Sequence, residues 1–473
     1  MKNIFIAVFC VAFAVAGPSK VSDLSPPEQA AIERISASAM RGNLSFLASD
    51  ALEGRDTPSR GLDIAAEYIA AQFRRAGLEP AAKDGSYFQI ARYADVSVKP
   101  EDFSIVLKTE GREMTLTGTD AGVQSVRGID LTNAAVVDLP AGGDALPPEI
   151  TGKVVAGDVR RYGGEAMLNR LQARKPALIL LMSRRRQAGG PETRDLEDVD
   201  STDAAVIRIA NGDAAAAVAA GKPIAVSAHL AAPALTVATV ENVVGVLPGS
   251  DPVLRNQYVI LSAHYDHLGT RGGQVYNGAN DNGSGTVSVI EIANALATLN
   301  PRPRRTIVFM TFFGEEEGLL GAYYYTRHPL FPLKNTVANI NLEQMGRTDD
   351  KEGSRVAAFS FTGPSYSDLP VTMTAAAKQE GVSVYVKSDA DQFFDRSDNY
   401  AFAQAGVVAH TAVVAYEYPD YHGPGDKWQK VDYANMAKVD RALAAGLLTI
   451  ANAGDPPRWS GIKPTAAYRE SAR

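Results

Sequence analysis

The residues best suited to metal chemistry are histidines and carboxylates that follow apolar runs. Residues 258–262 form such a run, which leads into His264 and Asp266. A second histidine, His422, lies in the turn-rich segment 416–426, which reads YEYPDYHGPGD. Imidazole and carboxylate groups together are ligands that zinc prefers, with bonds of about 2.0–2.2 Å. His264 and His422 are therefore the first candidates for a metal site.

Acidic residues also follow the next two apolar runs. Residues 306–313 lead into a glycine and three glutamates at 315–317, and residues 337–342 lead into Glu343. Continuous apolar runs of this length are typical of strands that are covered on both faces. In open α/β sheets, ligands bind beyond the carboxyl ends of the strands. We therefore expect these carboxylates to converge with His264 at one end of a sheet.

A cluster of buried carboxylates needs a compensating cation, because desolvated like charges repel each other. Glu315 and Glu316 are adjacent, so their side chains point in different directions, and one can bind a metal while the other acts as a general base. Asp281 lies in the Gly/Asn-rich loop 277–285, where glycine permits close approach of the backbone. Tyr421 places a phenol next to the second histidine.

Each of these features also has a plain structural interpretation. A run of glutamates is most often a solvated surface segment, and a Gly/Asn-rich loop is often an ordinary turn. An isolated histidine is usually a hydrogen-bonded polar residue, which is our interpretation of His229, His328 and His410. The order of the candidates at the ends of successive predicted strands favours a common site over coincidence.

Composition and absent motifs exclude several classes of protein. The 473 residues are 45% hydrophobic and 21% charged, as in globular proteins, and the formal charge of -7 offers no polycationic surface for nucleic acid or anionic lipid. The sequence contains no H-E-x-x-H, P-loop, G-x-S-x-G or G-x-G-x-x-G motif. Single-zinc helix proteases, P-loop enzymes, α/β-hydrolases and simple dinucleotide-binding proteins are thereby excluded.

The pattern of elements predicts an α/β fold, with a mixed, mostly parallel sheet sandwiched by helices. Apolar residues at helical spacing over 62–76, closed by Gly77, predict one helix. Residues 284–299 predict another helix between the first two strands. Residues 96–235 instead contain short Val/Ile runs separated by Gly, Pro and Asp, and an Ala-rich helix at 213–220. They predict a small inserted domain of the α+β or all-β type.

The chain begins with the features of a secretory signal peptide. Lys2 precedes the apolar run 4–16, which ends in Ala-Val-Ala and predicts cleavage before Gly17. Thirteen apolar residues are too few to span a bilayer, although an uncleaved anchor is the alternative interpretation. The single cysteine, Cys10, lies in this run, so the mature chain has none. An exported protein without disulfides favours a bacterial periplasm, and no other segment reaches membrane-spanning length.

Two segments resemble signatures of a known family. Residues 259–269 (VILSAHYDHLG) and 277–285 (NGANDNGSG) are similar to those of the co-catalytic zinc exopeptidases of metallopeptidase clan MH. That family includes bacterial leucyl aminopeptidase, aminopeptidase Y, glutamate carboxypeptidase and glutaminyl cyclase. Residues 44–80, which contain Leu-Glu-Gly-Arg at 52–55, resemble its N-terminal segment. Residues 96–235 look like an inserted protease-associated domain.

The resemblance implies a zinc exopeptidase fold, and together with the signal-peptide pattern and the Pro-rich end of the sequence it divides the chain into five segments. These are a signal peptide at 1–16, the N-terminal part of the peptidase domain at 17–95, the inserted domain at 96–235, the zinc peptidase catalytic domain at 236–455 and a peripheral tail at 456–473.

The resemblance also implies two zinc ions and a ligand set for them. His264 and Glu343 would bind the first ion, Glu316 and His422 the second, and Asp281 both. The family usually has aspartate where this chain has Glu343. The additional methylene gives this side chain on the order of 1.5 Å of extra reach.

Three further residues receive roles beside the metal ligands. By the resemblance, Glu315 would be the general base and acid, and Asp266 would orient the imidazole of His264. Tyr421 is a candidate donor to the tetrahedral oxyanion. Residues 396–399 (RSDN) resemble a family segment that usually reads S-D-H, and we interpret them as structural or substrate-adjacent.

These expectations predict an exported zinc aminopeptidase that hydrolyses N-terminal residues from peptide substrates. Three alternatives remain open. A carboxypeptidase would need a cation for the chain terminus, for which Arg396 is a candidate. A glutaminyl cyclase would perform acyl transfer with one zinc ion. A non-catalytic binding module of peptidase-like fold would have lost metal ligands, and Glu343 is the feature that favours it.

Overall fold

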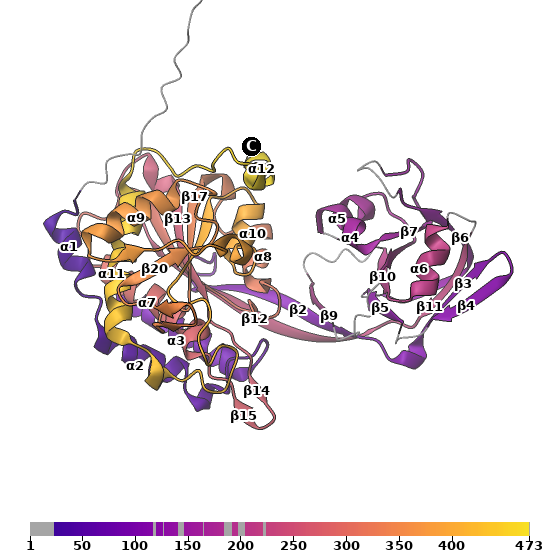
Figure 1. Ribbon diagram of the computed structural model, residues 1–473, viewed down its shortest axis with the longest axis horizontal. Coiled ribbons are helices and arrows are strands. Elements are labelled where there is room, and N and C mark those ends of the chain that lie inside the picture. Colours follow the sequence, from indigo (N-terminus) through magenta and orange to yellow (C-terminus); the bar gives the residue numbers. More distant parts are fainter. Residues whose placement is uncertain are drawn as a thin grey trace, which may run out of the picture. The chain divides into compact units, whose positions relative to one another are not determined.

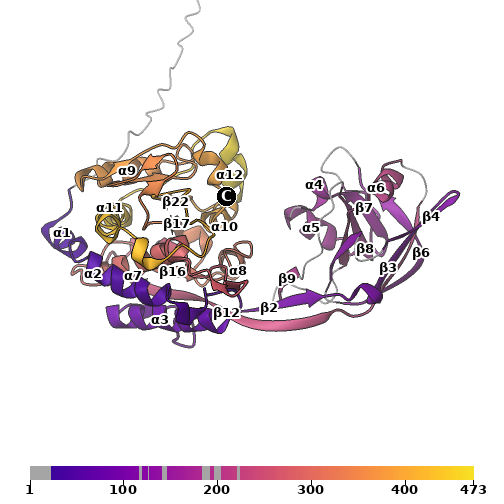
Figure 2. The same ribbon diagram turned by 60° about the horizontal axis from the view of Figure 1, so that its bottom comes forward.

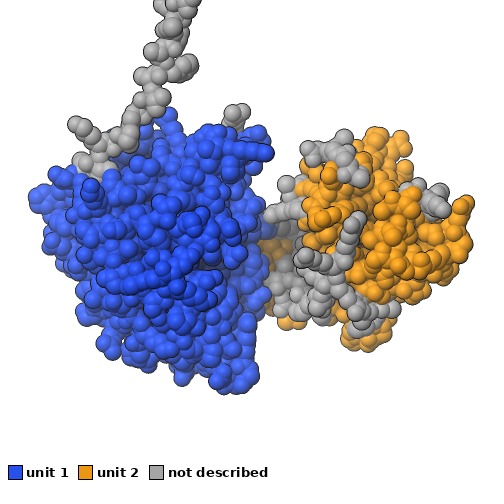
Figure 3. Space-filling view, in the orientation of Figure 1, with its two compact units in different colours: residues 1–90, 240–473 blue, residues 91–239 orange. Residues whose placement is uncertain are grey.

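The computed structural model describes residues 23–116, 120–125, 127–140, 146–163, 165–183, 192–196, 204–220 and 224–472. Two compact units make up the chain: unit 1 comprises residues up to 90 and from 240 onward, and unit 2 comprises residues 91–239 (Figures 1 and 3). The predicted signal peptide at 1–16, with Cys10 and the cleavage point before Gly17, lies outside the described residues. Within the described ranges, no helix is both long and apolar enough to cross a membrane.

Unit 1 is built on a mixed sheet. Its strands follow the order β21–β20–β22–β17–β13–β16–β12–β2, with bounds Ser383–Val384, Ala358–Phe361, Ala409–Val413, Thr336–Glu343, Tyr258–His264, Thr306–Phe312, Ala234–Leu247 and Phe88–Ser97. The central strands β13, β16, β17 and β22 are parallel to one another, whereas β12 and β20 run antiparallel to their neighbours β16 and β22. The short β1 (Glu79–Pro80) pairs with β12.

Helices cover both faces of this sheet (Figure 2). On one face α7 contacts β13, β16 and β17, and it is contacted in turn by α11, α3, α2 and α1, while α9 packs against α11. The bounds of α7, α11, α9, α3, α2 and α1 are Gly285–Leu296, Tyr433–Asn452, Leu369–Gln379, Arg60–Ala76, Ala37–Leu47 and Pro26–Ile32. The other face carries α8, α10 and α12, at Leu320–Arg327, Asn399–Gln404 and Ala466–Ser471. Alternate residues of β16, among them Val308, Met310 and Phe312, pack toward this second group. The predicted α/β fold is confirmed.

The predicted helices of unit 1 form for the expected reasons. In α3 the hydroxyl of Ser59 accepts a hydrogen bond of 3.1 Å from the amide of Leu62, and Gly77 ends the helix with φ of 78°. Its buried positions recur every three or four residues and face α7. Helix α7 ends at Leu296, three residues earlier than predicted, because residues 297–299 continue as a turn.

Unit 2 has a separate sheet with its own core. The strand order is β4–β3–β11–β6–β7–β8–β10–β5, with bounds Arg112–Leu116, Phe103–Thr109, Ala225–Leu230, Ile129–Asp138, Val154–Asp158, Leu178–Met182, Ala205–Ile209 and Ala121–Gln124. Strands β6, β7, β8 and β10 are parallel. Helices α4 (Val159–Tyr162), α5 (Glu165–Gln172) and α6 (Gly212–Ala219) accompany them, and β9 (Glu192–Asp195) pairs with β2. Its identity as a protease-associated domain stays a prediction.

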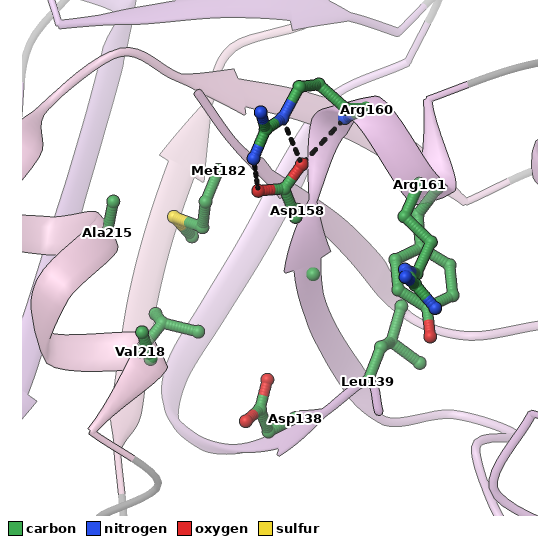
Figure 4. A pocket seen from close by; sticks show the side chains of 11 residues that line it. Asp138, Leu139, Asp158, Arg160, Arg161, Met182, Ala215 and Val218 are labelled. Carbon is green, nitrogen blue, oxygen red and sulfur yellow. Dashed lines mark hydrogen bonds and ion pairs between the residues drawn. The ribbon is translucent and has the colours of Figure 1, made fainter. Parts of the chain in front are cut away.

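A cavity of about 750 Å³ lies at the carboxyl ends of β6, β7 and β8 in unit 2 (Figure 4). Asp138, Asp158 and Met182 are the last residues of these strands and line it. Both the backbone amide and the guanidinium of Arg160 donate hydrogen bonds to the carboxylate of Asp158. These two charged side chains therefore pair with each other in the wall of the cavity. Val218 of α6 contributes an apolar side.

The C-terminal segment from 456, which the Pro-rich sequence predicts to be peripheral, packs on unit 1. The backbone of Trp459 forms an isolated antiparallel β-bridge with Ser367. Its indole N–H donates a hydrogen bond of 3.0 Å to the carbonyl of Gly406. Its ring packs against those of Tyr468 and His410. Aromatic burial, which the composition of the tail does not reveal, therefore anchors this segment.

Candidate active site

Three neighbouring strands deliver acidic and histidine side chains to one end of the sheet of unit 1. His264 is the last residue of β13, and Glu343 is the last residue of the adjacent parallel strand β17. Glu315 and Glu316 follow β16, on the other side of β13. Neighbouring parallel strands end at the same edge of the sheet. These four residues therefore lie together, as the sequence predicts.

Donor atoms for a first metal ion surround the Nε2 atom of His264. This atom lies 3.5 Å from Oδ1 of Asp281 and 3.4 Å from Oε1 of Glu343. Ligands bonded to zinc at 2.0–2.2 Å in a tetrahedral arrangement lie about 3.4 Å apart. Both separations from Nε2 of His264 match those between ligands of one zinc ion, and the longer side chain of Glu343 reaches this position.

A second group of donors lies on the other side of Asp281. The Nε2 atom of His422 is 3.1 Å from Oδ2 of Asp281 and 3.3 Å from Oε2 of Glu316. These separations again match ligands of one zinc ion. Asp281 is nearly fully buried, and its two oxygens face two different histidines. The arrangement suits a carboxylate that bridges two ions.

The charge of the cluster also favours cations. Burial would raise the pKa of Asp281, but hydrogen bonds with His264 and His422 outweigh it and hold the pKa far below its usual value. Hydrogen bonds to Asp281 and Glu316 raise the pKa of His422 to about 10. For Glu343, burial raises the pKa. These carboxylates and histidines therefore interact strongly with one another, and a divalent cation among them would change all of these pKa values.

Two residues outside the ligand set hold the loop that carries Asp281. The carboxylate of Asp426 accepts hydrogen bonds from the amides of Asn280 (2.9 Å) and Asp281 (3.1 Å) and from the Tyr418 hydroxyl (3.0 Å). These bonds fix the backbone of Asp281. Asp426 is the last residue of the segment that carries His422, so one segment supplies both a candidate ligand and the anchor for another.

The second of these residues is Arg55, a fully buried arginine from the N-terminal segment. Its guanidinium donates hydrogen bonds to the carbonyls of Tyr265 (2.7 Å), Asn277 (2.8 Å) and Gly278 (3.0 Å). Burial lowers its pKa to about 10, because the opposing attraction of Asp266 and other carboxylates is smaller. Arg55 thereby joins the end of β13 to the loop before Asp281.

Asp266 lies behind the cluster, as expected. Its Oδ1 atom is 3.3 Å from Nδ1 of His264 and accepts a hydrogen bond of 3.1 Å from the amide of Glu315. Its Oδ2 atom accepts a hydrogen bond of 3.3 Å from the amide of Glu316. One carboxylate therefore contacts the backbone of two glutamates and the ring of one histidine.

Glu315 and Tyr421 line the same cavity as the candidate metal ligands. The Oε2 atom of Glu315 is 3.8 Å from Nε2 of His264, and burial raises the pKa of Glu315 well above its usual value. A raised pKa suits a group that must accept and return a proton. The Tyr421 ring stacks on His422 at 4.1 Å, and burial raises the pKa of its hydroxyl, which keeps the proton.

Two neighbours of the ligands were not assigned a contact with them from the sequence. His267 lies 2.8 Å from Glu316, through its Nδ1 atom and Oε1, and it is fully buried. The hydroxyl of Ser397 donates a hydrogen bond of 2.6 Å to Oε1 of Glu343. A signal existed for both, since His267 follows His264 by three positions and Ser397 lies in the RSDN segment.

The three histidines interpreted as structural lie elsewhere. His410 is buried in β22, and its Nδ1–H donates a hydrogen bond of 2.9 Å to the carbonyl of Thr362 while the Ser367 hydroxyl contacts Nε2 at 2.6 Å. Burial lowers the pKa of His410 to about 4, so it is neutral. His229 is exposed on β11 of unit 2, and His328 packs against Tyr324.

The candidate ligands open into a cavity of about 430 Å³. Its apolar wall includes Leu319, Phe393, Val413 and Tyr416. The charged residues that line it are mostly acidic, and Arg396 is the single lysine or arginine among the lining residues. The acidic residues are Asp281, Glu315, Glu316, Glu343, Asp395 and Glu417.

Comparison with known proteins identifies the main part of unit 1. Residues 242–447 match the model of peptidase family M28. These residues form a domain of peptidase family M28. The expected relationship to co-catalytic zinc exopeptidases is confirmed, and the matched region contains all five candidate metal ligands.

Curated relatives of this M28 domain match over part of their lengths. A probable zinc metalloprotease of Leptosphaeria maculans is 28% identical over 269 residues, which are 48% of this chain and 61% of that protein. Aminopeptidase YwaD of Bacillus subtilis is 27% identical over 220 residues, 45% of each chain. The alignments thus span about half to three fifths of these relatives.

Solved structures share the fold over more of the chain. An aminopeptidase from Aneurinibacillus sp. strain AM-1 has a TM-score of 0.50 at 19% identity and covers 89% of this chain and 95% of its own. The LapA aminopeptidase of Legionella pneumophila has a TM-score of 0.50 at 13% identity, covering 96% and 81%. At these identities the likeness concerns the fold.

Proposed function

We propose that this protein is an exported zinc aminopeptidase that removes N-terminal residues from peptides. The observation that carries the proposal is the position of Asp281, whose Oδ1 and Oδ2 atoms lie 3.5 Å from His264 and 3.1 Å from His422. Two ligand groups that share one carboxylate are what a pair of metal ions requires.

The ligand groups would hold two zinc ions. His264, Glu343 and Oδ1 of Asp281 would bind one ion, and His422, Glu316 and Oδ2 of Asp281 the other. When bound, such ions supply Lewis-acid activation of a water and of a peptide carbonyl.

Glu315 would accept a proton from the attacking water and return it to the leaving amine. Its carboxylate lies at the cavity wall beside His264 and carries the raised pKa that such a shuttle needs. Asp266 would orient both the His264 ring and the Glu315 backbone. The protonated hydroxyl of Tyr421 would donate to the oxyanion of the tetrahedral intermediate.

The charge of the cavity favours an N-terminal ammonium over a C-terminal carboxylate. The two zinc ions would neutralise the ligands Asp281, Glu316 and Glu343. Three acidic residues that are not ligands, Glu315, Asp395 and Glu417, also line the cavity, against one arginine, Arg396, whose guanidinium lies over the Phe393 ring. The carboxylates that do not bind metal, such as Asp395 and Glu417, would attract the ammonium group of a free amino terminus. We therefore favour an aminopeptidase over a carboxypeptidase.

Export and the inserted domain belong to the same proposal. The sequence at 1–16 supports secretion, with cleavage before Gly17. Unit 2 would be the protease-associated domain. Mass spectrometry of the protein secreted by its host would give an N-terminus at Gly17, whereas an intact Met1 in the secreted protein would contradict cleavage.

The decisive experiment is the substitution Glu315→Gln, assayed on aminoacyl p-nitroanilides. It should lower kcat by about 10²–10⁴-fold, while two zinc ions per chain and the thermal stability are retained. Glu317→Gln is the matched control, because Glu317 is exposed in the same run. Full activity in Glu315→Gln would remove the assigned base.

Substrate blocking separates the remaining alternatives. N-acetylation of a peptide should abolish hydrolysis and C-terminal amidation should not. The opposite pattern would identify a carboxypeptidase, and release of pyroglutamate from N-terminal glutamine would identify a cyclase. Absence of any chelator-sensitive turnover would favour the binding module.

A further inference from the structure

His267 has no part in the mechanism proposed above, although it lies within the ligand cluster. Its ring is buried, and its Nδ1 atom is 2.8 Å from Oε1 of Glu316. The other oxygen of that carboxylate, Oε2, lies 3.3 Å from Nε2 of His422. The two oxygens of Glu316 thus face two different imidazoles.

The direction of the contact follows from its chemistry. An ionised carboxylate can only accept hydrogen bonds, so Nδ1 of His267 carries the hydrogen and donates it to Oε1 of Glu316. Without this donor the carboxylate could rotate and offer either oxygen, or both, toward His422. With it, Oε2 alone is turned to the second ligand group.

The ring of His267 is itself held in place. Its backbone amide donates a hydrogen bond of 3.1 Å to the carbonyl of Arg55. Gly278 packs against the ring so closely that no Cβ atom fits between them. Within the described residues, Nε2 of His267 has no hydrogen-bond partner. Nδ1 is therefore the ring atom that contacts the candidate ligand Glu316.

We propose that His267 is a positioning residue for the second metal ion: its Nδ1–H fixes Oε1 of Glu316, so that Glu316 binds the ion through Oε2 alone. This inference rests on the proposed function, because it requires the second ion. It assigns His267 no contact with the substrate. Hydrogen-bond partners of metal ligands typically contribute 10–100-fold to metal affinity.

Two amide substitutions test the atom that matters. At position 267, asparagine would place its side-chain nitrogen near the position of Nδ1 of the imidazole. Glutamine would place its side-chain nitrogen near the position of Nε2. Zinc titration against a chromophoric chelator should show near wild-type affinity for the second ion in His267→Asn. In His267→Gln the affinity should fall by about 10–100-fold, with the first ion unaffected. His229→Gln, at an exposed position of unit 2, is the control.

The visible absorption spectrum of cobalt-loaded protein gives an independent readout of the second site. We expect His267→Gln to change the bands that appear with the second equivalent of cobalt, and His267→Asn to retain them. Wild-type affinity in both variants would overturn the inference, and so would equal loss in both, which would indicate that the imidazole itself binds the ion. Wild-type protein that binds fewer than two zinc ions would instead overturn the proposed function, and this inference with it.

Discussion

The amide of Glu315 donates a hydrogen bond of 3.1 Å to the same oxygen of Asp266 that lies 3.3 Å from Nδ1 of His264. A single buried carboxylate therefore couples the backbone of the proposed base to the ring of a proposed metal ligand. The amide of Glu316 binds the other oxygen of Asp266. Asp266 is thus the point at which the ends of β13 and β16 are joined.

This coupling predicts that Asp266→Ala impairs both metal binding and turnover. Loss of the carboxylate frees the ring of His264 and the loop at Glu315, so we expect affinity for the first zinc ion to fall by about 10–100-fold. Zinc titration and kcat on a leucine p-nitroanilide would measure the two effects. Asp266→Asn keeps one acceptor and should lie between wild type and Asp266→Ala; an alanine variant with unchanged zinc affinity would contradict the coupling.

The surroundings of Glu343 predict that a shorter carboxylate binds the first ion less well. In Glu343→Asp the carboxylate withdraws on the order of 1.5 Å from His264 and from the hydroxyl of Ser397. We expect zinc affinity at the first site to fall about tenfold or more, measured by competition with a chelator. The family usually has aspartate here, so an equal or higher affinity would show that the site is not adapted to glutamate. Glu113→Asp in unit 2 is a suitable control.

Much of the fold of unit 1 could be predicted from the sequence, because its elements are specified locally. Helix α3 has a serine cap and a terminal glycine, and β13, β16 and β17 are continuous apolar runs. The course of the C-terminal segment could not be predicted. Trp459 is anchored by contacts with residues more than 50 positions away, such as Gly406, and local patterns carry no information about them.

Part of the candidate site was predictable, because its residues lie at the carboxyl ends of parallel strands. His264 and Glu343 end β13 and β17, so their convergence follows from parallel pairing. The contributions of His267 and Asp426 were not predictable in this way. Each depends on a contact across the fold, with Glu316 and with the backbone of Asn280 respectively.

A buried acid outside the site predicts a dependence of stability on pH. Asp440 of α11 is fully buried, and burial raises its pKa to about 8, more than the Ser288 hydroxyl lowers it. The unfolded chain releases this proton near pH 4 and the folded chain near pH 8. Protonated Asp440 therefore stabilises the folded chain fully below about pH 4. As the pH rises from about 4 to about 8, the free energy of unfolding falls by at most about 1.4 kcal/mol per pH unit.

Asp440→Asn removes this ionisation. Its melting temperature should match that of the wild type near pH 5 more closely than near pH 8.5, where the variant should be more stable by several degrees. Thermal unfolding followed by circular dichroism at both values would measure this. Asp130→Asn, at an exposed position of unit 2, should show no such trend. A constant difference between variant and wild type across the range would show that Asp440 does not titrate there.

The environment of Arg55 predicts that even lysine cannot replace it. The guanidinium donates separate hydrogen bonds to the carbonyls of Tyr265, Asn277 and Gly278, in directions that one ammonium group cannot reproduce. Hydrogen bonds from charged groups contribute about 1.5–3 kcal/mol each, so the loss of two should destabilise the protein by about 3–6 kcal/mol.

Thermal unfolding of zinc-free Arg55→Lys should reveal this loss, and zinc affinity should fall as well, because the same carbonyls fix the loop that carries Asp281. Arg75→Lys, on the exposed side of α3, should leave both quantities unchanged. If Arg55→Lys were as stable as the wild type but bound zinc weakly, Arg55 would act on the site alone. If zinc affinity were retained in a destabilised variant, the loop would be held by Asp426 without help from Arg55.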